Sequence, residues 1–290
     1  MGNTPIRITE CPRDAMQGLK EFIPTHEKIR YINALLKVGF EVIDFGSFVS
    51  PKAIPQMRDT GDVLRGLDLS ASSSKLLSIV ANKRGAIDAL QFEEIDFLGF
   101  PFSISETFQI RNTNAGIAES LERVLDIQDL CVANNRKLVT YISMAFGNPY
   151  GDPWNLSIAT QWVDRLVRAG IRYIALSDTV GIANPDSIAY LFAGLTKEYP
   201  ECHFGAHFHT QPSTWRRNVE AAYANGCRRF DTAVKGFGGC PMAKDDLTGN
   251  LPTENLLLFC VENEVDCGID KEVLLAAMDI ATEIFPGVRH

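Results

Sequence analysis

Two histidines separated by a single residue are the first sign of chemistry in this sequence. His207 and His209 lie in G-A-H-F-H-T, residues 205–210, an apolar setting that favours a strand. Side chains two positions apart on a strand point the same way, with attachment points about 7 Å apart. The two imidazoles could therefore bind one metal ion, or they could be an ordinary hydrogen-bonded strand pair. The choice depends on which other groups the fold brings beside them.

Oxygen ligands for such an ion are available elsewhere in the chain, and Asp14 and Asn250 are the best candidates. One carboxylate, one amide oxygen and two imidazoles suit an octahedral Mg2+ or Mn2+ with positions open for substrate, more than a closed zinc site. Each candidate also has an ordinary interpretation from its local pattern alone. Asp14 could form a surface ion pair or a helix cap, and Asn250 could cap the helix that follows it.

A glycine-rich segment carries a cysteine that could be reactive. Residues 235–250 read K-G-F-G-G-C-P-M-A-K-D-D-L-T-G-N, with three glycines just before Cys240 and a proline just after it. A hinged loop of this kind could close over a substrate, exclude water and bring the thiol to the reacting carbon. An inert buried cysteine is the alternative, although burial fits poorly with a polar, glycine-rich loop.

Short strand patterns alternate with amphipathic helix patterns along the whole chain, which predicts parallel strands joined by crossover helices. We predict eight strands, over residues 6–10, 41–46, 76–81, 94–100, 138–144, 173–178, 204–209 and 229–234. At this even spacing in 290 residues, the pattern predicts an α/β fold of the (β/α)8 TIM barrel type. A doubly wound sheet is the alternative, but no G-x-G-x-x-G follows the first strand.

The polar residues fit a barrel, in which catalytic groups lie at the carboxyl ends of the strands and in the loops that follow. The first strand ends in T-E-C-P-R-D, the second in D-F-G-S-F-V-S-P, the sixth in S-D-T-V-G and the seventh in H-F-H-T. No linker or low-complexity segment divides the chain. We therefore expect one catalytic domain over residues 1–290, with residues 263–290 as an added C-terminal helical segment.

Composition limits the partners and the compartment. The net charge is −8 and the basic residues are scattered, which argues against nucleic acid or a membrane as a partner. Seven cysteines without a C-x-x-C pair indicate reduced thiols. No apolar run reaches the length of a membrane span, and a strand pattern begins within a few residues of Met1. We expect a cytoplasmic homo-oligomer, with a dimer as the expected state.

Five motifs occur in order along the chain, namely T-E-C-P-R-D-A-M-Q, S-F-V-S-P-K-A-I-P-Q-M, S-D-T-V-G, H-F-H and G-F-G-G-C-P-M-A, followed by T-G-N-L-P-T-E-N. Through nearly the whole chain this series resembles the 3-hydroxy-3-methylglutaryl-CoA lyase family. The R-D and H-x-H elements are shared with a wider superfamily of metal-dependent TIM-barrel lyases and Claisen-type synthases. The S-F-V-S-P-K and G-G-C-P segments are more particular to the lyases.

The resemblance implies metal-assisted, retro-aldol or Claisen-type cleavage of a small acyl-CoA substrate. The family's typical substrate is hydroxymethylglutaryl-CoA, an intermediate of leucine degradation, which yields acetyl-CoA and acetoacetate. The implied ligands of the Mg2+ or Mn2+ ion are Asp14, His207, His209 and Asn250. Coordination would make the substrate hydroxyl more acidic.

The resemblance also implies roles for residues beside the metal. Arg13 would stabilise the thioester enolate, and Cys240 would protonate the departing carbon. Asp178 would act as a base or position the hydroxyl. Gln17, Asp44 and Ser47 are the expected substrate-binding residues.

Departures from the family pattern leave the acyl group open. Thr9 stands where the family usually has a glutamate, and the adjacent Glu10 should point to the other face of the strand. Asp44 replaces another usual glutamate, with a shorter reach. After H-F-H comes T-Q-P-S-T-W-R-R-N instead of an Asp-Thr pair and a glycine, and its Trp215, Arg216 and Arg217 are either a solvated helix start or a site for a different acyl or phosphate group.

Three other functions compete with the lyase. A related metal-dependent aldolase or Claisen-type synthase, acting on another acyl-CoA or oxo acid, is the main alternative. A zinc amidohydrolase would need further metal histidines, and the chain has five histidines in all. A barrel kept only for binding is disfavoured because so many candidate catalytic residues occur together.

Overall fold

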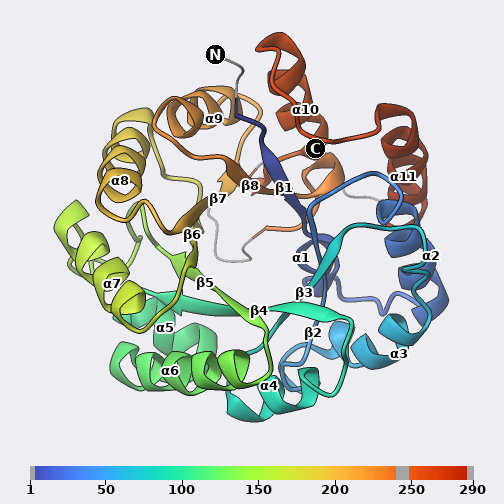
Figure 1. The fold of residues 1–290 in the computed structure, drawn as a ribbon, viewed down its shortest axis with the longest axis horizontal. Helices are drawn as coiled ribbons and strands as arrows, with labels where there is room; N and C mark the ends of the chain where they lie inside the picture. The colour runs from blue at the N-terminus through green and yellow to red at the C-terminus, as the bar shows by residue number, and fades with distance from the viewer. Residues whose placement is uncertain (1–3, 240–247, 286–290) are drawn as a thin grey trace.

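Eight parallel strands close into a barrel at the centre of the molecule (Figure 1). The computed structural model describes residues 4–239 and 248–285. Neighbouring strands in the chain pair with one another, and β8 pairs with β1 to complete the ring. The strands are β1 Arg7–Glu10, β2 Val42–Ser47, β3 Lys75–Ile79, β4 Ile95–Ser103, β5 Lys137–Ser143, β6 Tyr173–Asp178, β7 His203–Thr210 and β8 Arg229–Thr232. Each overlaps a predicted strand, and the predicted TIM barrel is confirmed.

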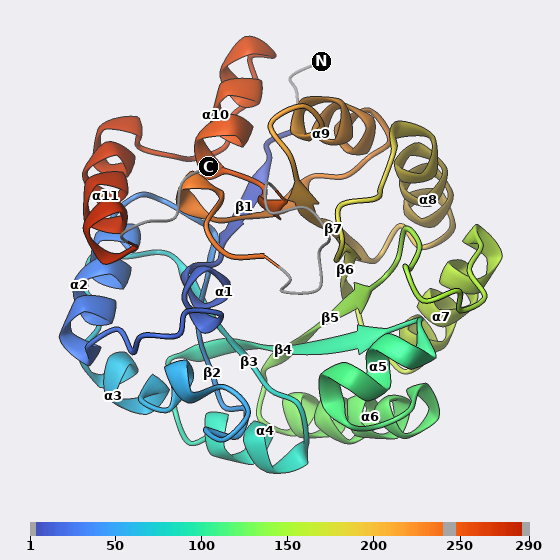
Figure 2. The same ribbon diagram turned by 180° about the vertical axis from the view of Figure 1, so that it is seen from behind.

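Helices surround the barrel on all sides (Figures 1 and 2). Those of the outer ring are α2 Thr25–Leu35, α3 Thr60–Arg65, α4 Lys83–Ala89, α6 Ile117–Ala133, α7 Leu156–Arg168, α8 Pro185–Glu198, α9 Trp215–Ala224, α10 Thr253–Glu262 and α11 Lys271–Ile284. Shorter helices occupy the connections after four strands, namely α1 Pro12–Gln17, the 3-10 helices η1 Pro55–Met57 and η2 Val234–Gly236, and α5 Glu106–Thr113. Within the described ranges, no helix has the length and apolar character needed to cross a membrane.

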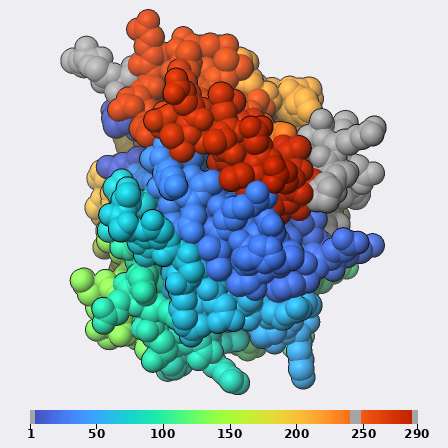
Figure 3. Space-filling view, turned by 90° about the vertical axis from the view of Figure 1, so that its right-hand side faces the viewer, coloured from blue at the N-terminus to red at the C-terminus, as the bar shows by residue number. Residues whose placement is uncertain are grey.

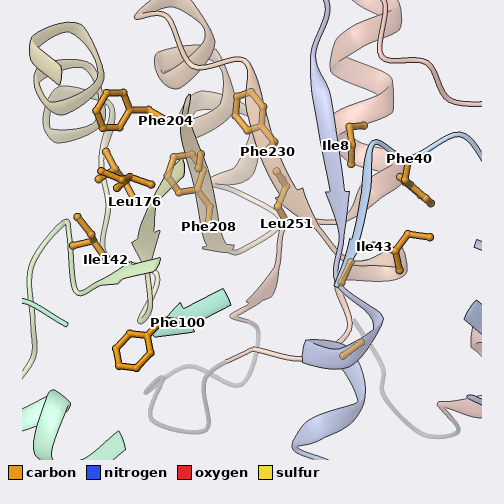
Figure 4. Close-up of a cluster of buried hydrophobic side chains, with 14 of the residues drawn as sticks. Ile8, Phe40, Ile43, Phe100, Ile142, Leu176, Phe204, Phe208, Phe230 and Leu251 are labelled. Carbon is orange, nitrogen blue, oxygen red and sulfur yellow. The ribbon is translucent and has the colours of Figure 1, made fainter. Parts of the chain in front are cut away.

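Strand alternation divides the buried apolar side chains between two clusters. The larger joins outward-facing strand residues such as Ile43, Phe100 and Phe230 to the helices around them (Figure 4). The smaller fills the barrel itself, with Val42, Leu77, Ile79, Phe97, Val139, Tyr141 and Ala175. Both faces of each strand are therefore buried, which explains the nearly continuous apolar runs in the sequence.

Residues near the C-terminus pack against an N-terminal helix. Figure 3 shows the last helices lying directly beside the N-terminal segment. Arg30 of α2 forms an ion pair with Glu283 of α11 at 2.6 Å, and the ring of Tyr31 meets the edge of Phe285 with centroids 5.8 Å apart. The described part of the segment predicted to be helical, residues 263–285, thus contains α11, and this part of the chain packs against α2.

Glu10 links the first and last strands to helix α10. Its carboxyl group accepts hydrogen bonds from the hydroxyls of Thr253 (2.6 Å) and Thr232 (3.1 Å) and from the backbone N–H of Val234 (2.7 Å). These partners place Glu10 on the outer face of the sheet, as the alternation predicted. Burial raises the pKa of Glu10 to about 8, although the hydrogen bonds act in the opposite direction.

The raised pKa of Glu10 predicts a specific dependence of stability on pH. Above pH 4.5 the unfolded chain loses this proton while the folded protein keeps it until about pH 8, so the unfolded state binds fewer protons. Between these values Glu10 should lower the free energy of unfolding by about 1.4 kcal/mol per pH unit. Glu10→Gln keeps a neutral group there and should remove that contribution. Urea denaturation of both proteins from pH 5 to pH 8 measures the difference, and parallel stability curves would contradict the prediction.

Candidate active site

Asp14, His207 and His209 meet at the carboxyl end of the barrel. One potential ligand atom from each lies within 4.8 Å of the others. Asp14 comes from α1, directly after β1, and both histidines come from β7. The three side chains line a cavity of about 210 Å³. The structure therefore brings together the imidazoles and the carboxylate that the sequence suggested.

Hydrogen bonds leave one nitrogen of each histidine directed toward this group. The Nδ1 atom of His209 lies 2.8 Å from the carbonyl oxygen of Thr179. Because a carbonyl can only accept, Nδ1 of His209 carries the proton and Nε2 keeps its lone pair. That Nε2 atom is buried and has no hydrogen-bond partner among the described residues. An unpartnered imidazole nitrogen facing a carboxylate and a second imidazole fits a divalent cation.

The electrostatics favour the deprotonated forms of His209 and Asp14, whereas Asp231 raises the pKa of His207 against the effect of burial. Burial, together with the nearby His207, lowers the pKa of His209 to about 4, so this imidazole is neutral at pH 7. Burial alone would raise the pKa of Asp14, but the charge of Arg13 and the two histidines outweigh it and lower the pKa to about 2. Asp14 is therefore ionised over the whole physiological range. Metals bind these deprotonated forms.

Three donors hold the carboxylate of Asp14 in place. Its Oδ1 accepts from Arg13 Nη1 (2.9 Å) and from Gln17 Nε2 (2.8 Å), and its Oδ2 accepts from Asn250 Nδ2 (2.7 Å). Asn250 belongs to β9, Gly249–Asn250, which pairs antiparallel with the end of β7 so that Asn250 lies opposite His209. All of the predicted metal ligands thus lie side by side.

Gly238 lets the chain after β8 lie directly against these ligands. Its φ angle is +85°, in the left-handed region that side chains rarely adopt. A Cβ atom there would lie 2.7 Å from the carbonyl oxygen of Asp14 and 2.9 Å from Nδ2 of Asn250. Conformation and contact both require glycine, which gives a structural reason for part of the glycine-rich motif.

Arg13 is held between two carboxylates. Its Nε donates to Asp44 Oδ2 at 3.1 Å, its Nη2 donates to the same oxygen, and its Nη1 donates to Asp14. The guanidinium is almost fully buried yet lines the cavity, whereas Asp44 lies behind it and does not. Burial raises the pKa of Asp44 to about 6 although Arg13 acts against the shift. Asp44 thus orients Arg13 and makes no contact with the cavity.

Asp178, a predicted catalytic residue, does not line the cavity. Both carboxylate oxygens of Asp178 accept backbone N–H groups, from Ile182 and Ala183, at 2.9 Å each. Asp178 pairs in register with Phe208, so it points to the outer face, and its neighbours Ser177 and Thr179 line the cavity instead. Burial raises the pKa of Asp178 to about 6.

Of the remaining candidates, Ser47 accepts a hydrogen bond from the backbone N–H of Val49 at 3.2 Å and is not part of the cavity wall. Gln17 does line the cavity, next to Asp14. Cys240 lies outside the described residues.

One side of the cavity is apolar. The segment after β2, strands β3 to β5, and helix α5 contribute Val49, Ile54, Ile79, Ala81, Pro101, Phe108 and Tyr141. Two polar residues of α5, Asn112 and Thr113, lie at its margin. The cavity therefore joins a charged end, which contains Asp14 and Arg13, to an apolar wall.

The altered segment after His209 contributes Trp215, Arg216 and Arg217 to helix α9. Trp215 is buried and begins α9, and Arg216 forms an ion pair with Glu262 of α10. Arg217 is exposed. None of these residues lines the cavity, which favours the helix-start interpretation over a second anion site.

The sequence analysis missed Asp231. This residue pairs in register with His207 across β7 and β8, and its carboxylate lies 3.2 Å from His207 Nδ1. A carboxylate at an inward position of an apolar strand was the available signal, because such a residue is rarely buried without a partner.

Comparisons with known proteins agree with this geometry. Residues 6–280 match the family model described as HMGL-like. The hydroxymethylglutaryl-CoA lyase of Bacillus subtilis is 32% identical over 92% of this chain and 88% of its own. A Pseudomonas aeruginosa 3-hydroxy-3-isohexenylglutaryl-CoA/hydroxymethylglutaryl-CoA lyase is 32% identical over 94% of this chain and 90% of its own.

Solved structures of such lyases resemble this structure closely. The HMG-CoA lyase of Bacillus subtilis gives a TM-score of 0.91 at 31% identity, over 98% of this chain and 95% of that one. An HMG-CoA lyase of Acinetobacter baumannii, in complex with coenzyme A and 3-methylmalate, gives 0.88 at 31% identity, over 97% of this chain and 91% of that one.

Gly238→Ala should destabilise the protein by about 1–3 kcal/mol, because alanine is strained at this φ angle and its Cβ would meet Asp14. Gly18→Ala is the matched control, since nothing lies within 4 Å of a Cβ at Gly18 and its φ is −82°. That control should change the free energy of unfolding by less than about 1 kcal/mol. Chemical denaturation measures both, and equal effects of the two substitutions would contradict the prediction.

Proposed function

The chain belongs to the HMGL-like family, and we propose that it is a divalent-metal-dependent carbon–carbon lyase that cleaves hydroxymethylglutaryl-CoA to acetyl-CoA and acetoacetate. The observation that carries this proposal is the group of Asp14, His207 and His209 beside Arg13 in a single cavity. Relatives at about one-third identity are named as lyases of this substrate, and a structural neighbour binds coenzyme A.

A divalent cation, Mg2+ or Mn2+, would be held by Asp14, Asn250 and the Nε2 atoms of His207 and His209. When bound, it would polarise the substrate oxygens and make the 3-hydroxyl more acidic. Gln17 would support the site by holding one oxygen of Asp14. Asp178 would contribute indirectly, since it fixes the turn after β6, next to the Thr179 carbonyl that orients His209.

Arg13 would stabilise the negative charge of the thioester enolate as the carbon–carbon bond breaks. Its guanidinium is already oriented by Asp44 and Asp14, so it need not reorganise during the reaction. Few water molecules can screen a group this deeply buried, which strengthens its interaction with developing charge. Cys240 would then give a proton to the departing carbon.

A related aldolase or Claisen-type synthase, acting on another acyl-CoA or oxo acid, is the second candidate. The observation that favours it is the missing carboxylate at position 9. Thr9 pairs with Asp231 and Val42 and so faces the barrel interior, where the family's usual glutamate would lie. Among the described cavity-lining residues, Asp14 is the only carboxylate. Cytoplasmic location and a homodimer remain predictions.

The metal-loaded protein should release acetyl-CoA from hydroxymethylglutaryl-CoA. Chelation should abolish the activity, and Mg2+ or Mn2+ should restore it. His207→Ala and Asp14→Asn should each lower kcat/KM by about 100-fold or more, because each removes a proposed ligand. Mass spectrometry of the products measures the reaction.

A panel of 3-hydroxy-acyl-CoA and hydroxy-oxo-acid substrates distinguishes the two candidate functions. Release of pyruvate from an oxo acid, with every CoA substrate inert, would replace the lyase with an aldolase. Full activity of a chelated, metal-free preparation would refute the metal site. Arg84→Ala is a suitable control, since Arg84 is exposed on α4, outside the cavity wall.

Cys240→Ser should lower kcat by about 100-fold or more, because a hydroxyl is a much weaker acid than a thiol. Mn2+ affinity should stay within about two-fold of wild type, since the serine leaves the proposed ligands intact. Cys202→Ser, at a partly buried thiol outside the cavity, is the matched control. Steady-state kinetics and Mn2+ titration measure these effects, and full turnover by Cys240→Ser would make the thiol structural only.

A further inference from the structure

A buried carboxylate lies directly behind His207. Asp231 is 2% exposed, and its Oδ2 atom lies 3.2 Å from Nδ1 of His207. Its second oxygen, Oδ1, is buried without a hydrogen-bond partner among the described residues. Asp231 does not line the cavity, so it reaches that space only through the imidazole of His207.

The surroundings of Asp231 offer little compensation for its charge. Its one ion pair among the described residues is with His207. Arg229, two residues earlier on β8, donates to the carbonyl of His203 instead. The thiol of Cys11 lies within 4.8 Å of both the carboxylate and the imidazole, and the Tyr141 ring packs edge-on against His207. A carboxylate with so few partners is costly to bury, which calls for a compensating role.

Each of the two histidines has a different partner at Nδ1. His209 donates to the neutral carbonyl of Thr179, whereas His207 faces a carboxylate. A carboxylate that accepts a hydrogen bond from Nδ1–H fixes the ring plane and leaves the lone pair of Nε2 free. It also makes Nε2 a better electron-pair donor to a metal ion on the side of the ring that faces the cavity.

We propose that Asp231 is the positioning residue that fixes the tautomer and orientation of His207 for binding the divalent cation. The inference rests on the proposed metal role of His207. By holding the ring with Nε2 toward the cavity, Asp231 strengthens cation binding.

Asp231→Asn tests this role because it keeps the size of the side chain and replaces the carboxylate with an amide. Mn2+ affinity should fall by about 10- to 100-fold. The metal-free variant should remain folded, so that the loss of affinity reflects the binding site. In wild type, the proton of the His207 ring should lie on Nδ1, whereas the variant should show a mixture, since an amide can either accept from Nδ1 or donate to it.

The experiment uses the full chain after EDTA treatment and dialysis. Calorimetric titration with MnCl2 gives the affinity, thermal unfolding of the metal-free proteins gives the stability, and long-range 1H–15N NMR spectra identify the protonated ring nitrogen. Thr140→Val is the matched control, because Thr140 on β5 is also buried with an unpartnered side-chain oxygen but lies outside the cavity wall. It should leave the affinity for Mn2+ unchanged.

The outcomes separate this inference from the proposed function. If wild type takes up no Mn2+, the proposed metal site fails, and the positioning role fails with it. If wild type binds Mn2+ and Asp231→Asn binds within two-fold as tightly, only the positioning role is overturned. Wild-type His207 with its single ring proton on Nε2 would also overturn it.

Discussion

Charge buried at one end of the barrel is the constraint on which the rest of the site depends. Asp44, Asp14 and Asp231 are buried carboxylates, and Arg13 is the guanidinium among them. The carboxylates outnumber the guanidinium, and the imidazole of His209 is neutral at pH 7, whereas Asp231 raises the pKa of His207 so that this imidazole offsets part of the charge. Carboxylates in excess of cations are unfavourable in a closed interior unless a further positive charge joins them. A divalent cation beside His209 would supply that charge, so the same residues that cost stability are those that would select the ligand.

The two faces of each strand pack against different parts of the molecule, and this arrangement forms the barrel around the charged end. Outward residues pack on the helices, and the inward residues Val42, Leu77 and Phe97 form an apolar layer in the barrel. The polar groups of the site lie at the carboxyl ends of the strands, where Gly238 and β9, which follow β8, approach Asp14. The site is completed by residues more than two hundred positions apart, which only closure of β8 onto β1 makes neighbours.

The order and type of the main strands could be predicted because each is a short apolar run between amphipathic helices. Strand β9 could not, since two residues carry no periodicity and pair only because β7 lies beside them. The motifs and the family resemblance led us to expect His207, His209, Asp14 and Arg13 together, and the structure brings them together. They also led us to expect Asp178 in the site, but the structure does not place Asp178 on the cavity wall. Asp178 is at the end of its strand, as predicted, yet its register with Phe208 turns it outward. Sequence position locates the end of the barrel, and register decides which residues face the cavity.

The departures from the family pattern differ in consequence once they are placed in the structure. Trp215 and Arg216 belong to the packing and surface of α9, so the unusual segment after β7 alters the scaffold more than the cavity. Thr9 is different because it pairs with Asp231 and faces the barrel interior. A glutamate there would add a fourth carboxylate to an interior in which carboxylates already outnumber the guanidinium. With Thr9, the described part of the cavity has no carboxylate apart from Asp14, so under our proposal proton transfer must depend on groups other than a glutamate at this position.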